Sequence, residues 1–277
     1  KACEWLEHNY RHENFYLMVD TFDPHEPWDA PEWYLQRFDP DDYDGPEPIY
    51  PPYGPNKMDE RTTQRLNALY RAEACLVDNW IGHLLRKIEY MGLLENTMVI
   101  FMADHGFLLG EHDLIAKNFS MYEEVVHIPL MIYHPDGQPR RTDALTSIID
   151  IPATVVDVFA AKCGDRVEGI SLLPTVMGET DYLRDYAISH GAWSGGWSPD
   201  GGSPHGHVTD EAWSLLLENQ GPPNKLFHLP SDPEQMNNRF ESDTNEAQRL
   251  YRAFLEFLEK HGGAPDMVET FRQRWEF

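Results

Sequence analysis

Basic residues, cysteines and long apolar runs are all scarce in this chain of 277 residues. Lysine and arginine together number 22, against 47 aspartates and glutamates, so the formal net charge is −25. Nucleic acid and anionic membrane surfaces would repel a chain of this charge, and we expect neither as a partner. Since no run of eighteen apolar residues occurs, the sequence also excludes a transmembrane helix.

The three cysteines, Cys3, Cys75 and Cys163, are too few and too widely spaced for a disulfide framework or a zinc cluster. We interpret them as ordinary thiols. A hydrophobic content of 41% with 25% charged residues is typical of a folded globular protein, so the chain is expected to bury a substantial core.

The most informative segment runs from Met98 to Lys117. An apolar, β-branched run up to Ala103 predicts a buried strand, which ends in Asp104, His105 and a glycine. Ligands in open α/β sheets collect at the carboxyl ends of strands, where a carboxylate and an imidazole can both face one divalent cation. Lys117 adds a positive charge twelve residues beyond His105. A cation beside a lysine suits the neutralisation of a tetrahedral oxyanion such as sulfate or phosphate.

This segment and the residues after it resemble the metal-binding motif of the sulfatase family, within the alkaline-phosphatase-like superfamily. An isolated Asp-His-Gly would be a weak match, but the ordered set is specific. It comprises Asp104-His105-Gly106, Leu109-Gly110-Glu111-His112, Lys117, Met121-Tyr122-Glu123-Glu124 and Ile128-Pro129-Leu130. Later matches extend the resemblance over nearly the whole chain. They are residues 149–154, residues 169–172, and residues 225–234 with Asn237 and Asn238.

The resemblance implies that Asp104 and His105 bind a divalent cation, with Ca²⁺ favoured and Mg²⁺ or Mn²⁺ as options. It also implies further ligands from an Asp-Asp pair after the first strand of the family's fold, and we find no such pair after a strand here. No cysteine stands in the Cys-x-Pro/Ala-x-Arg setting that sulfatases oxidise to a formylglycine nucleophile. We therefore expect these parts in a missing amino-terminal half of the same protein, and we expect the 277 residues alone to be inactive.

His25 lies in Asp23-Pro-His-Glu-Pro27, which resembles the sulfatase loop Asp-Pro-His-x-Pro. The resemblance implies that His25 binds the bridging ester oxygen and helps to protonate the leaving alcohol. It implies that Lys117 contacts a non-bridging sulfate oxygen and the leaving-group oxygen. Both residues are therefore predicted to be catalytic and to bind substrate.

Several other residues keep two interpretations. Trp28 belongs either to an aromatic rim for a sugar ring, together with Trp33, Trp193 and Trp197, or to the buried contacts that anchor its loop. His205 and His207, at the end of a glycine-rich stretch, could line the pocket from the C-terminal subdomain, and their i, i+2 spacing is only weak evidence for a metal site. The remaining motif residues are expected to support structure, with one glutamate orienting Lys117: Glu111, His112, Tyr122, Glu123 and Glu124.

Alternating elements over residues 1–180 favour an α/β fold, with a mostly parallel sheet flanked by helices. The pattern predicts a buried strand over 14–20, a long ordered insertion over 29–57 and a helix over 59–91. Further elements are strands over 98–103 and 129–133 and helices over 120–126 and 151–161. In family terms this is an incomplete alkaline-phosphatase-like domain.

After residue 180 the pattern changes to short strands over 185–189, 212–217 and 225–229, followed by an amphipathic helix over 246–260. We predict a small antiparallel sheet with a packing helix, forming a C-terminal α+β subdomain over residues 181–277.

These expectations favour part of a metal-dependent sulfatase acting on sulfated small molecules or carbohydrates. Two alternatives stay open. One is a phosphonate monoester or phosphodiester hydrolase of the same superfamily. The other is a non-catalytic binding domain with a sulfatase-like fold.

Overall fold

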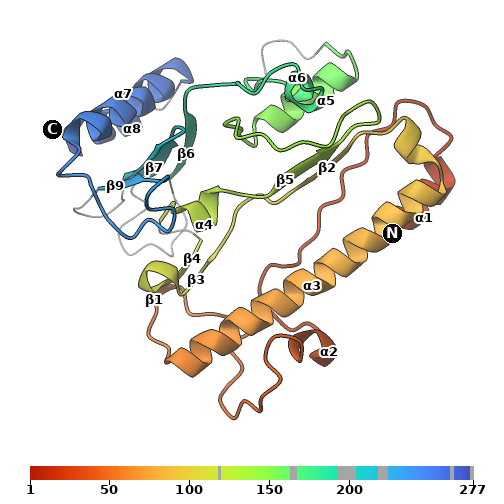
Figure 1. Ribbon diagram of the computed structural model, residues 1–277, viewed down its shortest axis with the longest axis horizontal. Helices are drawn as coiled ribbons and strands as arrows, with labels where there is room; N and C mark the ends of the chain where they lie inside the picture. The colour runs from red at the N-terminus through yellow and green to blue at the C-terminus, as the bar shows by residue number, and fades with distance from the viewer. Residues whose placement is uncertain (118–119, 163–166, 193–203, 218–223, 263–264, 275–277) are drawn as a thin grey trace. The chain divides into compact units, whose positions relative to one another are not determined.

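The computed structural model describes residues 1–117, 120–162, 167–192, 204–217, 224–262 and 265–274. It divides into two compact units: residues 1–100, 108–116 and 132–135 form the first, and residues 101–107, 117–131 and 136–277 the second. Figure 1 labels their helices and strands. Cys3 and Cys75 are free thiols. Cys163, Trp193 and Trp197 lie outside the described residues.

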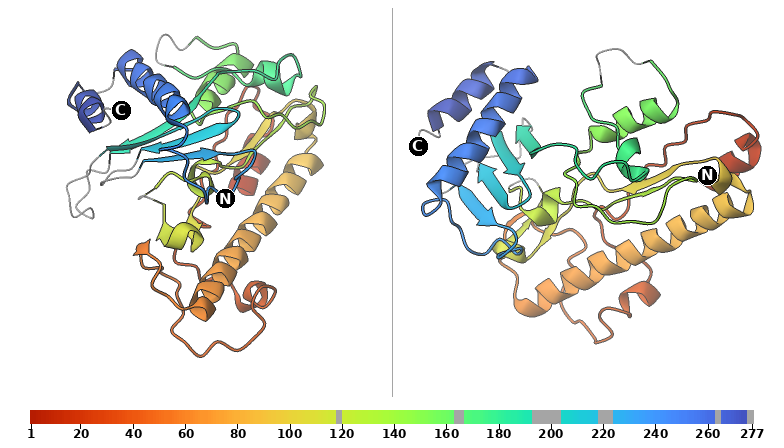
Figure 2. Two further views of the ribbon diagram at one scale, coloured as in Figure 1. Left: turned by 60° about the vertical axis from the view of Figure 1, so that its left-hand side comes forward. Right: turned by 45° about the horizontal axis from the view of Figure 1, so that its top comes forward.

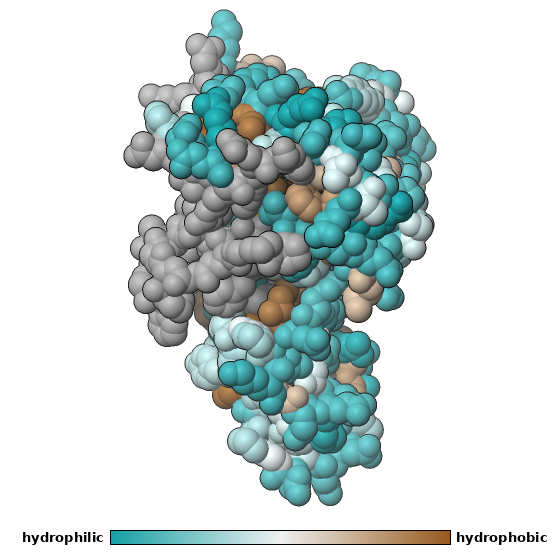
Figure 3. All heavy atoms as spheres, turned by 90° about the vertical axis from the view of Figure 1, so that its left-hand side faces the viewer, coloured by the Kyte–Doolittle hydropathy of each residue, from teal (hydrophilic) through white to brown (hydrophobic). Residues whose placement is uncertain are grey.

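The surface drawn in Figure 3 is mainly hydrophilic, with apolar residues scattered across it, as the acidic composition leads one to expect. None of the helices within the described ranges has the length and apolar character needed to cross a membrane.

The main element of the first unit is helix α3 (Glu60–Tyr90), which confirms the helix expected over 59–91 (Figure 1). The Asp59 carboxylate caps it by accepting the Thr62 backbone N–H at 2.7 Å. Gly92 ends it with φ +69°, a left-handed conformation that favours glycine, and the 3-10 helix η1 (Leu93–Glu95) follows.

The segment before α3 differs in part from the prediction. After helix α1 (Ala2–Asn9), residues 15–20 form no helix and pair with no strand in the described part of the chain. Tyr16, Met18 and Val19 are 59%, 70% and 46% exposed. The buried strand predicted over 14–20 is therefore wrong for this structure, because an apolar run becomes a strand only where a neighbouring strand supplies hydrogen bonds.

The insertion over 29–57 is ordered, as expected, and includes helix α2 (Glu32–Leu35) and strand β1 (Gly54–Pro55). The buried guanidinium of Arg65 in α3 holds it by donating to the Asp39 carboxylate at 3.1 Å and the Glu47 carboxylate at 2.5 and 3.0 Å. Strand β1 pairs antiparallel with β4 (Leu114–Ala116), which also pairs with β3 (Leu108–Leu109). The 3-10 helix η2 (Glu111–Asp113) connects β3 to β4.

Strands β2 (Val99–Met102) and β5 (Leu130–Tyr133) pair in a two-stranded sheet, near the ranges predicted for both. Both strands belong to the sheet that we expected over residues 1–180. The mostly parallel arrangement of that sheet stays a prediction. The helical turn predicted over 120–126 is the short helix α4 (Glu123–Val126), and the helix predicted over 151–161 is α5 (Asp150–Val158).

In the second unit, the buried Asp150 carboxylate joins the start of α5 to the segment that precedes helix α6 (Leu173–Val176) and to Arg184 beyond that helix. It accepts the backbone N–H groups of Ser147 and Ile170 at 2.7 and 2.9 Å, and both terminal nitrogens of Arg184 at 2.8 and 2.5 Å. A Cβ at Gly169 would lie 1.9 Å from the Ile149 carbonyl oxygen, so this position has no room for a side chain.

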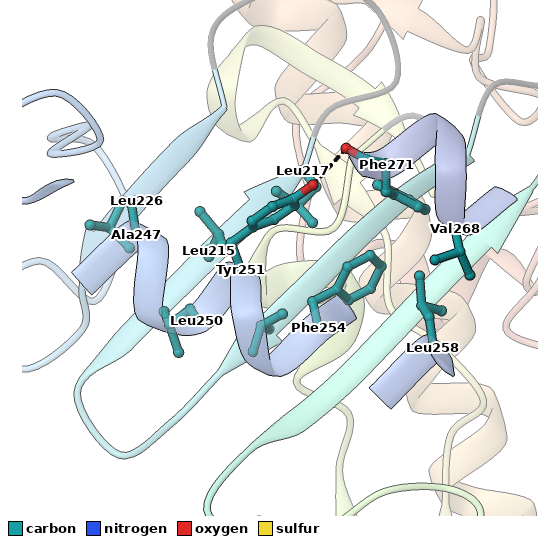
Figure 4. Packing of buried hydrophobic residues seen from close by; sticks show 11 residues of the cluster. Leu215, Leu217, Leu226, Ala247, Leu250, Tyr251, Phe254, Leu258, Val268 and Phe271 are labelled. Carbon is teal, nitrogen blue, oxygen red and sulfur yellow. Dashed lines mark hydrogen bonds between the residues drawn. The ribbon is translucent and has the colours of Figure 1, made fainter. Parts of the chain in front are cut away.

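The C-terminal part of the second unit is the predicted antiparallel sheet with a packing helix (Figure 2). The strand order is β6 (Ala187–Ala192), β7 (Pro204–Thr209), β8 (Trp213–Leu217) and β9 (Lys225–His228). Helix α7 (Thr244–Lys260) packs on this sheet through Leu250, Phe254 and Leu258, and helix α8 (Pro265–Arg274) adds Phe271 (Figure 4). The boundary at residue 180 stays a prediction.

Candidate active site

Asp104 and His105 follow β2 directly and present their ligand atoms side by side. The His105 Nδ1 lies 2.9 Å from the Gly106 carbonyl oxygen, which only accepts, so Nδ1 carries a proton and Nε2 keeps its lone pair in the neutral ring. This Nε2 lies 3.8 Å from the Asp104 Oδ2. Two neighbouring ligands around one Ca²⁺ ion are about 3.5 Å apart. The pair therefore fits a shared cation, and the Asp104 side chain is 86% exposed.

These two side chains supply only part of a coordination shell. Ca²⁺ takes six to eight oxygen-rich ligands. Across the described ranges, no group of three or more His, Cys, Asp or Glu side chains is arranged to hold a metal ion. That this chain contributes two ligands to a larger site stays a prediction.

Gly106 ties the Asp104–His105 pair to helix α4. Its backbone N–H donates to the Val125 carbonyl at 2.8 Å. A Cβ on Gly106 would lie 1.9 Å from the Glu124 carbonyl oxygen, so only glycine allows the two backbones to approach this closely. The third residue of the Asp-His-Gly motif is thus required by packing.

Lys117 lies in the same unit as Asp104 and His105 and is half-buried. Its ammonium group is 5.8 Å from the centroid of the Phe107 ring, within the range of a cation–π contact. Phe107, the residue directly after Asp-His-Gly, therefore contacts Lys117.

In the Gly-Glu-His turn of the first unit, Glu111 has a structural role. The Glu111 carboxylate accepts the Leu109 N–H at 2.6 Å, and Asn67 of α3 donates to the Leu109 carbonyl at 2.8 Å. His112 has φ +55°, a left-handed conformation that L side chains rarely adopt. These bonds keep the turn in a strained shape.

His25 lies on a loop of the first unit, with its side chain 40% exposed. The His25 Nδ1 lies 2.7 Å from the Glu26 carbonyl oxygen, which places the proton on Nδ1, and the ring stacks on Phe22 at a centroid distance of 4.6 Å. Tyr53 donates to the Glu26 carboxylate. The loop is therefore held on both sides of the histidine.

Trp28 is fully buried. Its indole N–H donates to the Pro24 carbonyl at 3.0 Å, and its ring packs edge-on against Tyr70 of α3 with centroids 5.4 Å apart. Burial and the internal bond favour the loop-anchoring role of Trp28 over contact with a sugar ring. Trp33, by contrast, is 68% exposed.

Glu73 of α3 is a buried residue near this loop that sequence reasoning missed. Burial and the nearby Asp23 carboxylate raise its pKa, while the backbone N–H groups of Asp29 and Ala30 oppose the rise. The sequence does contain a sign of this buried carboxylate: Glu73 stands four positions after Leu69, on the buried face of an amphipathic helix.

The predicted site residues thus fall into two groups. Asp104, His105 and Lys117 share the second unit, and His25 and Trp28 share one loop of the first. The structure thus places a carboxylate–imidazole pair at a strand end, in the same unit as Lys117 and a small antiparallel C-terminal sheet.

Sequence comparison identifies the family. A profile described as "Sulfatase" matches residues 1–161, and one described as "N-sulphoglucosamine sulphohydrolase, C-terminal" matches residues 110–261. The chain belongs to the sulfatase family. The arylsulfatase of Clostridium perfringens is 27% identical over 281 residues, which cover 94% of this chain and 55% of the relative. The chain spans about half the length of the curated relatives it matches.

Solved structures agree on the fold. One, in complex with its substrate D-glucosamine-2-N,6-O-disulfate, is 26% identical with a TM-score of 0.63, covering 74% of this chain and 42% of that chain. The phosphonate monoester hydrolase of Agrobacterium radiobacter is 21% identical with a TM-score of 0.77, covering 94% of this chain and 60% of that chain. At this identity the second likeness concerns the fold alone.

Proposed function

We propose that the protein containing this chain is a metal-dependent sulfuric ester hydrolase that acts on sulfated carbohydrates. One observation carries the proposal: the His105 Nε2 and the Asp104 Oδ2 are 3.8 Å apart at the end of β2, in a chain of the sulfatase family. The disulfated glucosamine bound by a relative of known structure supports the carbohydrate class.

In this proposal Asp104 and His105 hold a divalent cation, with Ca²⁺ favoured because carboxylate oxygen is its preferred ligand. When bound, the cation neutralises charge on the sulfate oxygens. Lys117 binds a non-bridging sulfate oxygen and the leaving-group oxygen, because its ammonium group offers three donors. Phe107 limits where that ammonium group can move, since the two are in contact.

His25 protonates the departing alcohol in this proposal. The Glu26 carbonyl engages Nδ1, so Nε2 is the ring atom that holds the transferable proton in the imidazolium form. Stacking on Phe22 limits rotation of the ring. Trp28 keeps the loop against α3.

The nucleophile, a formylglycine, and the Asp-Asp pair are expected in sequence outside these 277 residues. We also propose that β2 and β5 belong to a larger, mostly parallel sheet over residues 1–180, followed by a subdomain over 181–277. On this proposal the 277 residues alone hydrolyse no sulfate ester.

The test uses the full-length gene product and an aryl sulfate, with and without Ca²⁺. D104A and K117A are each expected to lower kcat/KM at least about 100-fold, since each removes charge stabilisation of the transition state. K260A, at an exposed position ending α7, is the matched control and should retain wild-type kcat/KM. Wild-type activity in D104A would refute the proposed roles.

A phosphonate monoester or phosphodiester hydrolase is the second candidate, because the fold is shared with a phosphonate monoester hydrolase. Comparing kcat/KM for an aryl sulfate, an aryl phosphonate and a phosphodiester on the same preparation decides between them. A protein that turns over none of the three and lacks an upstream nucleophile would be the non-catalytic binding domain.

A further inference from the structure

Helix α4 is too short to be stable alone, yet it carries the backbone on which Gly106 packs. It has four residues, and an isolated helix of one turn is strongly unfavourable. The Val125 carbonyl accepts the Gly106 N–H, and the Glu124 carbonyl occupies the space where a Gly106 side chain would be. Whatever holds α4 therefore also fixes the strand end that carries Asp104 and His105.

Gln235 holds the start of α4 from far away in the sequence. Its Oε1 accepts the backbone N–H of Glu123, the first residue of the helix, at 2.8 Å. Its Nε2 donates to the Ser214 Oγ of β8 at 2.9 Å, and Ser214 is bonded to the His207 Nε2 of β7 at 2.9 Å. Gln235, Ser214 and His207 are 2%, 0% and 2% exposed, so these bonds form away from solvent.

The backbone of Gln235 indicates that its side chain matters. Its φ is +51°, a left-handed conformation in which glycine is favoured and glutamine is rare. The Asp232 carboxylate stabilises this turn by accepting the N–H groups of Met236 and Asn237 at 3.0 and 2.8 Å. Glycine would fit this backbone with less strain, but it would bond neither Glu123 nor Ser214.

We propose that Gln235 is a positioning residue for the Asp104–His105 pair. It anchors the first turn of α4 to the C-terminal sheet, and α4 in turn fixes Gly106 and the two ligands that precede it. All these residues belong to the second unit. The inference rests on the proposed function for the meaning of the pair, and it adds a residue that acts on the pair through α4.

The experiment measures Ca²⁺ binding by calorimetry on metal-free full-length protein, beside kcat and KM for an aryl sulfate. Q235A is expected to raise the Kd for Ca²⁺ about tenfold or more, a loss typical of residues that orient metal ligands, and to lower kcat more than it raises KM. Q235E keeps an acceptor for the Glu123 N–H and should restore most of the affinity.

T154A is the matched control for loss of stability. Thr154 is as buried as Ser214, lies in the same unit, and accepts the Leu172 N–H at 2.8 Å, which links α5 to the start of α6. It should lower the melting temperature but leave the Kd for Ca²⁺ unchanged. If Q235A proves insoluble, S214A tests the same anchor and should raise Kd in the same direction.

Unchanged Kd in soluble Q235A, or an equal rise in T154A, overturns the positioning role. These outcomes differ from failure of the proposed function, in which the wild-type protein itself neither binds Ca²⁺ nor hydrolyses the sulfate ester.

Discussion

Gly106 must both donate a backbone hydrogen bond to α4 and leave room for the backbone of that helix. Its N–H must reach the Val125 carbonyl, and its missing side chain leaves space for the Glu124 carbonyl. The residue adjacent to the Asp104–His105 pair is therefore constrained by packing on α4. Small backbone shifts here would move Asp104 and His105 together.

Gly106→Ala is expected to destabilise the fold by about 1–3 kcal/mol, the usual cost of overpacking, because the new Cβ would meet backbone that cannot rotate away. Urea unfolding measures the change. Gly82→Ala is the control: it lies inside α3, meets nothing closer than the Arg86 side chain at 3.4 Å, and should stabilise by up to about 1 kcal/mol. Equal effects at the two positions would contradict the packing argument.

The ligand candidates were accessible from sequence because their signal is local. Asp104, His105 and Lys117 stand in an ordered motif within a short segment. Gln235 was not accessible, since its partner Glu123 lies 112 positions away and a glutamine in a turn carries no pattern of its own. The tautomer of His105 likewise depends on a bond that only the fold reveals.

At the scale of elements, α5 and the chain leading to β6 are joined through one buried carboxylate. Asp150 is fully buried and meets two backbone N–H groups and both terminal nitrogens of Arg184. Each bond satisfies a group that would otherwise be buried without a partner. Two segments that match sulfatase patterns, residues 149–154 and 169–172, meet at this point.

Asp150→Asn is expected to cost about 3 kcal/mol or more, because it leaves the Arg184 guanidinium largely buried without its counter-charge. Asp181→Asn breaks the exposed pair with Arg140 and should cost less than about 1 kcal/mol. Chemical denaturation of both variants gives the comparison. A loss at Asp150 no larger than that at Asp181 would show that the buried pair is dispensable.

The elements predicted best are those whose boundaries are set by residues close to them in the sequence. Helix α3 carries its own cap in Asp59 and its own stop in Gly92, and α7 its own apolar face. The sequence did not predict strand β7, because Pro204-His-Gly-His-Val-Thr209 lacks apolar alternation. Antiparallel hydrogen bonds to β6 and β8 make it a strand. The strand predicted at residues 15–20 was wrong for the opposite reason: the segment has the apolar pattern of a strand but no described strand beside it to pair with.

For the whole molecule, the formal net charge of −25 makes stability depend on how the carboxylates are paired. Glu123 is the clearest case. Burial raises its pKa, but the neighbouring His127 and His207 imidazoles outweigh this and lower the pKa to about 2. The same Glu123 carboxylate raises the pKa of His127.

The sign of the pH dependence follows from these two shifts. A carboxylate with a lowered pKa stabilises the fold above its unfolded pKa, and the contribution is lost as the pH falls toward about 2. The raised pKa of His127 acts in the other direction, with a contribution that is complete below its unfolded pKa and lost as the pH rises above the folded one. Between these limits Glu123 contributes on the order of 1–3 kcal/mol, since one pKa unit corresponds to about 1.4 kcal/mol and solvent screens the 79% exposed His127 side chain.

The difference in unfolding free energy between wild type and E123Q should therefore be largest near pH 5–6, shrink steeply toward pH 2, and decline more gently above pH 7. Urea unfolding of both proteins at pH 3, 6 and 9 measures it. Repulsion from the remaining charges is nearly the same in both proteins and cancels in the difference. A difference that does not vary with pH would mean that Glu123 acts through its shape and its hydrogen bonds, and that its charge contributes little to the stability of this acidic protein.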